Sequence, residues 1–270
     1  MPPDSEARLQ YVRSLAAEEL KSLLHESGEA ILLALLENPN LEESHVALLL
    51  ERLDLPASVL TVVAGEGKWS SREGVRLALA RHPRTPKRFA LAAVRQLFLF
   101  DLVRLSFLPS APADIRRIAE EVILTRVPHL SIGEKLTLAR RGPSRVAGAI
   151  LAEGHPQAIK LALANTFLTE SQVLKVLAKQ SLPERVVAAI TRHRKWSCQY
   201  NVRMALVRNP HTPRAAVEAI LPQLTLADLE QIARLEGLAR HLKKYVREEL
   251  MRRANDPDAS AGATAEREIE

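Results

Sequence analysis

The residues best suited to chemistry are the histidines and the single cysteine, and their spacing does not build a metal site. The eight histidines are His25, His45, His82, His129, His155, His193, His211 and His241. No two of them lie four residues apart, and neither an HExxH nor a CxxC motif occurs. Because zinc needs three or four converging Cys, His or carboxylate ligands, the sequence predicts no bound metal ion.

Nucleotide binding and covalent catalysis also lack their usual residues. The sequence contains neither GxxxxGK[ST] nor GxGxxG, so the glycine-rich loops that cradle phosphates are missing and no cofactor is expected. Cys198 has no neighbouring catalytic motif, and we predict that it is a small packing residue. Adjacent carboxylates such as Glu18 and Glu19 point in different directions on a helix. We therefore predict that the protein is not an enzyme.

Lysine and arginine are the remaining candidates for contact with a partner. Three cations recur at one constant offset along the chain, as Lys68 with Lys195, Arg76 with Arg203, and Arg81 with Arg208. The full candidate set is Lys68, Arg72, Arg76, Arg81, Arg192, Arg194, Lys195, Arg203 and Arg208. Two interpretations stay open, because a repeated arginine can bind a partner or pair with a neighbouring helix end. Trp69 and Trp196, which each follow a lysine, are predicted to be packing anchors.

These residues lie within an internal duplication. Shifting the chain against itself, so that residue 68 meets residue 195, aligns the two halves without a gap, and the segment Lys68–Pro86 then meets Lys195–Pro213. Agreement of this density over a long stretch points to two copies of one ancestral unit. We predict one copy over residues 1–127, a second over 128–254, and an acidic, disordered tail over 255–270.

Within each copy, short helical patterns alternate with turns. Apolar residues recur at i, i+3 and i+4, as in Val46, Leu49 and Leu50. Proline or a capping residue stands near many of the predicted helix starts. The pattern predicts about nine helices per copy and no sheet. Helices this short are marginal alone and need neighbours on more than one side. The predicted fold is therefore all-α, an α-solenoid in which the two copies form one continuous stack.

The unit VRxALxRxPxTP, found at Val75–Pro86 and Val202–Pro213, resembles the leucine-rich-repeat variant and HEAT-like helical repeats of bacterial proteins. The resemblance extends at repeat level over most of residues 28–250. It implies an α–α superhelix and a role in binding a macromolecule. It implies no particular activity, because one fold can carry many functions.

Charge and composition restrict the partner and the compartment. The net charge is +6, and because residues 255–270 carry −4, the remainder carries +10. A basic body favours an anionic partner. One cysteine cannot form an internal disulfide, and we see neither a secretory signal nor an apolar run long enough to span a bilayer. We therefore expect a cytoplasmic protein without membrane insertion.

Two functions from different classes follow from these observations. We predict first a scaffold or adaptor that binds a protein partner along the solenoid surface. The alternative is nucleic-acid binding through a basic face, an analogy with HEAT-like DNA glycosylases. Aromatic residues make up only 4% of the chain, too few for a base-stacking platform. A third reading, similarity to the HEAT-like lyases that handle phycobilin pigments, lacks residues that could carry the chemistry.

Overall fold

The computed structural model describes residues 3–235 and 240–255, and every regular element in these ranges is helical. The prediction of an all-α protein is confirmed for this part of the chain. The chain divides into two compact units, Met1–Pro128 and His129–Glu270. None of the described helices is both long and apolar enough to cross a membrane. Of the predicted tail, Asn255 ends the last helix and the rest lies outside the described residues.

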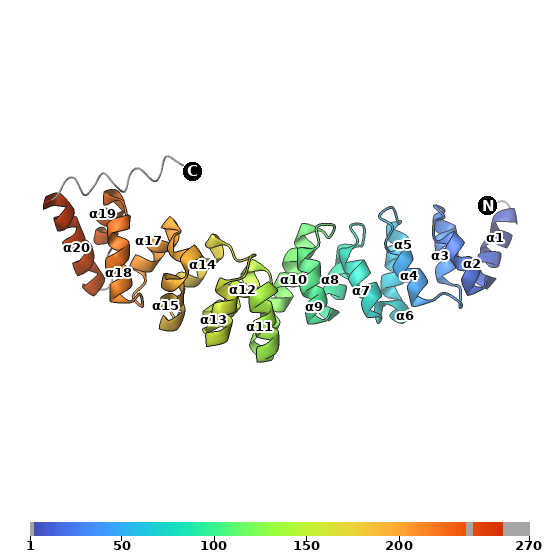
Figure 1. Cartoon of the computed structure of the whole chain (residues 1–270). Coiled ribbons are helices and arrows are strands. Elements are labelled where there is room, and N and C mark those ends of the chain that lie inside the picture. Colours follow the sequence, from blue (N-terminus) through green and yellow to red (C-terminus); the bar gives the residue numbers. More distant parts are fainter. Residues whose placement is uncertain (1–2, 236–239, 256–270) are drawn as a thin grey trace. The chain divides into compact units, whose positions relative to one another are not determined.

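The described part of the first unit contains ten α-helices, which Figure 1 shows in blue to green. They are α1 (Pro3–Ser14), α2 (Ala17–Leu23), α3 (Glu29–Leu36), α4 (Glu43–Leu49), α5 (Ala57–Gly65), α6 (Gly67–Ser70), α7 (Glu73–Arg81), α8 (Lys87–Gln96), α9 (Leu99–Phe107) and α10 (Ala113–Arg126). The 3₁₀-helix η1 (Val127–His129) follows α10.

The second unit also contains ten α-helices among its described residues. They are α11 (Ile132–Arg141), α12 (Ser144–Glu153), α13 (Pro156–Leu163), α14 (Glu170–Leu177), α15 (Glu184–Arg192), α16 (Arg194–Ser197), α17 (Tyr200–Arg208), α18 (Arg214–Ile220), α19 (Leu226–Arg234) and α20 (Arg240–Asn255). The 3₁₀-helix η2 (Leu221–Gln223) continues from α18.

The helices of the two units correspond closely in length and position. Adding 127 to the bounds of α3, α5, α6, α7 or α9 gives the bounds of α13, α15, α16, α17 or α19. The number per unit exceeds the expected nine because α6 and α16 are single turns of four residues. A single turn is too short to show a hydrophobic period, so the sequence pattern missed it.

Proline stands at the start of many of the helices, which confirms the prediction from the sequence. Proline is the residue immediately before α5, α8, α10, α12, α15 and α18, with φ between −53° and −61°. Two helices, α1 and α13, begin with proline itself, at Pro3 and Pro156. Ser131, Thr169 and Thr225 start other helices by accepting a backbone N–H.

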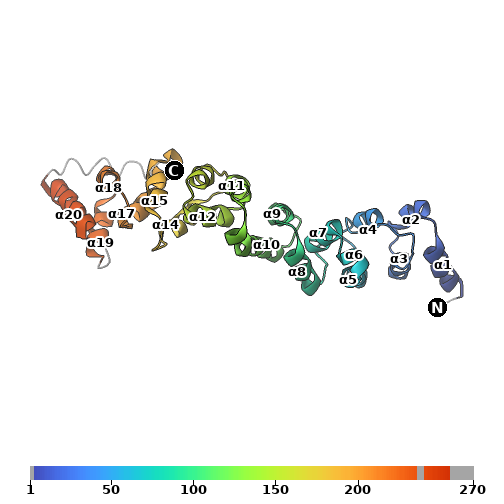
Figure 2. The same cartoon turned by 90° about the horizontal axis from the view of Figure 1, so that it is seen from below.

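Within each unit the helices form two rows, which Figures 1 and 2 show side by side. In the first unit, α1, α3, α5, α8 and α10 contact one another in succession, and α4, α7 and α9 form the second row. In the second unit, α12, α14 and α17 form the corresponding second row. Leucine, valine and alanine fill the space between the rows. Trp69 and Trp196 are 2% and 1% exposed, which confirms that they are packing anchors.

Buried polar side chains hold the turns against the preceding helices. The Asn38 amide donates to the Val12 and Leu15 carbonyls at 2.8 and 3.1 Å. Asn165, its counterpart in the second unit, repeats this contact by donating from its amide to the Ala139 carbonyl at 2.9 Å. The two asparagines therefore satisfy carbonyls that the helix ends leave unpaired.

A histidine and an asparagine make the next pair of turn contacts. The His82 Nδ1 accepts the Arg84 N–H at 3.1 Å, and Nε2 lies 2.7 Å from the Arg52 carbonyl. The amide of Asn209, the counterpart of His82, donates to Leu177 O at 2.9 Å. These contacts require a neutral His82 with its proton on Nε2.

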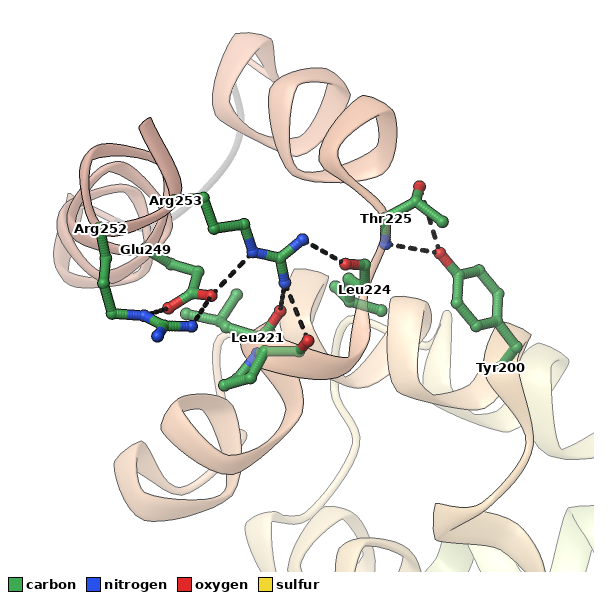
Figure 3. A network of polar contacts seen from close by, with 8 residues as sticks. Tyr200, Leu221, Leu224, Thr225, Glu249, Arg252 and Arg253 are labelled. Atoms are coloured by element: carbon green, nitrogen blue, oxygen red, sulfur yellow. Dashed lines mark hydrogen bonds and ion pairs between the residues drawn. The ribbon is translucent and has the colours of Figure 1, made fainter. Parts of the chain in front are cut away.

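An arginine on the last α-helix of each unit binds carbonyls in the same way. The Arg126 guanidinium donates to the Leu97 and Arg95 carbonyls, both at 2.8 Å. Figure 3 shows Arg253, whose guanidinium donates to Leu224 O at 2.8 Å. Arg253 also donates to Leu221 O at 3.0 Å and to the Glu249 carboxylate at 2.9 Å. In this way each arginine ties its helix to the turn between the two preceding helices.

Candidate functional site

Two of the predicted cations are bound to other groups of the protein. The Arg76 guanidinium pairs with the Glu73 carboxylate and donates to Gln96 at 3.2 Å, and its side chain is only 17% exposed. Arg203, at the matching position of the second unit, donates from Nε to Ser197 O at 2.9 Å. Each arginine is thus bound within its own unit, although the two matched side chains reach different groups.

The recurring lysines lie over the buried tryptophans. The Lys68 ammonium is 4.3 Å from the centre of the Trp69 ring, and the Lys195 ammonium is 4.2 Å from that of Trp196. Such contacts are cation–π interactions, worth about 0.5–1 kcal/mol at exposed sites. The two lysines thus cover their tryptophans while remaining exposed.

The other predicted cations differ in their surroundings. Arg72 and Arg81 are near carboxylates, at 3.8 Å from Glu43 and 3.9 Å from Glu51 respectively. Arg192 and Arg194 are exposed, on α15 and α16. Arg208 is exposed at the end of α17. Of the nine predicted cations, it is the one that lines the groove of the second unit.

A groove of about 820 Å³ crosses the second row of helices in the second unit. Residues of α14, α17 and α19, with the turns that follow α14 and α17, line it. The lining residues are Leu174, Leu177, Ala178, Lys179, Gln180, Tyr200, Asn201, Met204, Ala205, Arg208, Asn209, Pro210, His211, Asp228 and Gln231. The volume falls within the range typical of ligand sites.

The groove combines apolar and polar side chains. Leu174, Leu177 and Met204 supply apolar surface from α14 and α17. Gln180 and Gln231 add neutral amides, each with donors and an acceptor for hydrogen bonds. A mixture of apolar surface and a few polar groups is typical of sites that bind a specific ligand.

Tyr200 and Asp228 form a rigid polar cluster at the beginnings of α17 and α19. The Tyr200 hydroxyl donates to the Asp228 carboxylate. It also accepts the Thr225 N–H at 3.1 Å, as Figure 3 shows. The Thr225 hydroxyl also donates to the Asp228 carboxylate, at 2.6 Å. These bonds hold both groove residues in fixed positions.

Lys179 and Arg208 form the cationic end of the groove. Lys179 follows α14 and Arg208 ends α17, and both side chains are exposed. Neither side chain has a hydrogen-bond or ion-pair partner among the described residues. His211, on the same side, lies 3.6 Å from the Glu184 carboxylate. This end therefore offers two uncompensated positive charges to a ligand.

Catalytic features are sparse in the described part of the chain. No group of three or more His, Cys, Asp or Glu residues in residues 3–235 and 240–255 is placed to hold a metal ion. The prediction that Cys198 is a packing residue is wrong, because its side chain is exposed. The residue follows the single turn α16, where little of the chain can cover it.

Sequence reasoning found one groove residue, Arg208, and missed Lys179, Tyr200 and Met204. Six of the nine candidates were residues that are identical in the two halves, whereas most of the groove is built from residues that differ between them. A comparison of the differences would have shown the signal, because Ala178 stands in the second half where the first has Glu51. Comparison of the chain with known protein families, curated proteins and solved structures finds no match.

Proposed function

We propose that this protein is a non-enzymatic scaffold or adaptor that binds a protein partner along the surface of a helical solenoid. In this proposal the two units are tandem copies, residues 1–127 and 128–254, of the HEAT-like and leucine-rich-repeat-variant type, and they form one continuous stack. We further infer a cytoplasmic location, which the single cysteine favours.

The tandem-copy proposal is supported by contacts as well as by sequence. Helix bounds coincide under the same shift that aligns the two halves of the sequence, as α7 and α17 illustrate. Asn38 and Asn165 bind carbonyls at corresponding turns, and so do Arg126 and Arg253. In both units, these matching side chains bind carbonyls at matching positions. Such agreement is hard to explain without common ancestry.

The groove of the second unit is the observation that carries the binding proposal. Its apolar side chains and its two uncompensated cations form a surface that remains open to a ligand. The described residues bring no recognisable catalytic set to this place, so recognition explains the surface better than a reaction. Scaffold proteins built from stacked helices bind through such extended faces.

Nucleic acid is the less favoured partner. Arg76 and Arg203 are engaged within the protein, and Arg72 and Arg81 are near carboxylates. Nucleic-acid binding relies on many phosphate contacts, whereas the groove offers two free cations and also presents Asp228. A carboxylate in the binding surface would repel a phosphate backbone.

Site-specific photo-crosslinking tests the proposal. Gln231 in the groove is replaced with p-benzoylphenylalanine in the full chain, and the exposed Glu218 on α18 is replaced as the control. In native lysate we expect a defined protein adduct only from position 231. The identified protein, once purified, should bind the wild-type chain. Equal adducts from both positions, or adducts removed by nuclease, would contradict the proposal.

A further inference from the structure

The internal duplication provides a comparison that defines the chemistry of the groove. Positions 52 and 81 of the first unit correspond to Lys179 and Arg208, so each unit carries a pair of cations at the ends of matching helices. In the first unit these cations have partners. Arg52 donates to the Asp54 carboxylate at 2.8 Å, and Arg81 lies 3.9 Å from Glu51. The hydrogen bond from Arg52 lowers the pKa of Asp54, which keeps the carboxylate charged.

Both carboxylates are missing from the second unit. The residues that correspond to Glu51 and Asp54 are Ala178 and Ser181. Arg52 also donates to the Leu24 and Glu26 carbonyls at 2.6 and 2.7 Å. Lys179, in its place, makes no such contact among the described residues. The second unit therefore has the two cations without the carboxylates that neutralise their counterparts in the first.

The change is specific to this pair and is not a general gain of positive charge. Two further arginines of the first unit, Arg84 and Arg104, correspond to His211 and Gln231 in the second. The second unit thus has fewer charges of both signs here than the first, while its two neighbouring cations stand without carboxylates. A lysine and an arginine held at adjacent helix ends without partners favour an anionic group from outside.

We propose that the groove of the second unit binds an acidic peptide segment of a partner protein. Carboxylates of the segment pair with Lys179 and Arg208, and an aliphatic side chain of the segment packs against Leu174 and Met204. The inference rests on the proposed scaffold function and adds the chemistry of the partner. A peptide fits better than a nucleic acid because the groove is partly apolar. A peptide can also place a neutral residue beside Asp228, whereas a nucleic acid carries a charge on every phosphate.

The neutral amides in the groove suit the same ligand. Gln180 and Gln231 present both donors and acceptors, which match the N–H and C=O groups of a peptide in extended form. The Tyr200 and Asp228 cluster lies at the beginning of α17, while Arg208 lies at its end. The polarity of the groove therefore sets a direction for the peptide, with its acidic residues nearest Arg208.

A display library of random dodecapeptides, selected on the full-length protein, tests this inference. We expect enrichment of peptides that carry Asp or Glu next to an aliphatic residue. The double variant K179E/R208E should weaken binding of a synthetic enriched peptide by about tenfold or more, as expected for close charge pairs. The matched control R192E/R194E changes net charge by the same amount at exposed sites outside the groove. It should leave the dissociation constant within about twofold.

Three outcomes would overturn the inference. Enriched peptides without acidic residues, equal binding to K179E/R208E, or no enrichment at all would each exclude an acidic peptide from the groove. None of them contradicts the scaffold function, which the crosslinking experiment tests separately. Binding of an oligothymidylate of fifteen nucleotides is measured in parallel. If K179E/R208E weakens binding of this oligonucleotide and no peptide binds, both proposals are contradicted. The milder variant K179A/R208A should also bind the peptide more weakly than the wild type. Its circular dichroism spectrum and melting curve, compared with those of the wild type, show that the weaker binding does not come from unfolding.

Discussion

A single imidazole shows how one residue type can replace another in the same structural role. His82 accepts the Arg84 N–H and lies 2.7 Å from the Arg52 carbonyl. Asn209 likewise accepts the His211 N–H, and it donates to the carbonyl of Leu177, two residues before the counterpart of Arg52. Both side chains combine an acceptor with a donor at a similar separation. Unlike asparagine, however, histidine can take up a proton. The contacts of His82 in the first unit therefore depend on pH, whereas those of Asn209 in the second unit do not.

Burial lowers the pKa of His82 from its ordinary value of 6.5. The folded protein consequently binds fewer protons at this site than the unfolded chain does, so the free energy of unfolding falls as pH drops below 6.5. We expect the variant H82N to lose less stability over this pH range than the wild type. Part of the loss should remain in H82N, because burial also lowers the pKa of His193. Urea unfolding of both proteins at several pH values between 7.5 and 5 measures the difference. Identical pH profiles for H82N and the wild type would show that His82 is not responsible.

Trp196 is the largest fully buried side chain, and its indole N–H donates to Leu163 O at 3.0 Å. We expect W196A to lower the free energy of unfolding by about 3–5 kcal/mol, because it removes a large side chain and leaves a cavity. The control K195A removes only the cation–π contact and should cost about 1 kcal/mol or less. Urea denaturation measures both changes. A W196A protein as stable as the wild type would move this residue from packing to partner recognition.

At the scale of elements, one buried arginine links α20 to the preceding turn. Arg253 is 6% exposed, and its guanidinium reaches three backbone carbonyls and Glu249. The hydrogen bond from Arg252 and the bond from Arg253 lower the pKa of Glu249, so this carboxylate stays charged. The network in Figure 3 therefore depends on a charge pair that is largely removed from water.

We expect R253A to destabilise the second unit by about 3 kcal/mol, because it leaves buried carbonyls and a buried carboxylate with fewer partners. R253K should recover little, since an ammonium group cannot reach the carbonyls as a planar fork does. R252A, which removes the more exposed partner of Glu249, should cost about 1 kcal/mol or less. Amide hydrogen exchange of α20 measures these effects. Unchanged exchange in R253A would mean that apolar contacts alone hold the helix.

The sequence could predict the elements better than the groove. Proline, capping residues and the i, i+3, i+4 pattern mark most helices, because these signals are local to each helix. Four-residue helices such as α6 are too short to show this pattern, whereas proline directly precedes six helices as a start signal should. The groove depends on which side chains of different helices face one another. Nothing in the sequence around Lys179 or Met204 indicates that the two residues line the same groove, so this becomes visible only in the folded structure.

At the scale of the whole molecule, the proposed solenoid predicts how the two units depend on each other. In a stacked array each layer is stabilised by its neighbours, so stability is approximately a sum of intrinsic and interface terms. Each unit is compact, and five helices of the first have counterparts of equal length in the second. Residues 1–128 and 129–270, expressed as separate chains, should therefore fold into helical structures.

Expressing the two units as separate chains also removes the interface that the proposed stack would form between them. If the two units are joined as layers of one solenoid, an equimolar mixture of the separate chains should melt at a lower temperature than the intact protein, because the ends at the cut face lose apolar contacts to water. Circular dichroism in the far ultraviolet, recorded at several concentrations, measures the difference, and recovery at high concentration would show that the cut faces rebind. A mixture that melts like the intact chain at every concentration would mean that two independent units are joined in sequence, and the continuous stack would have to be abandoned.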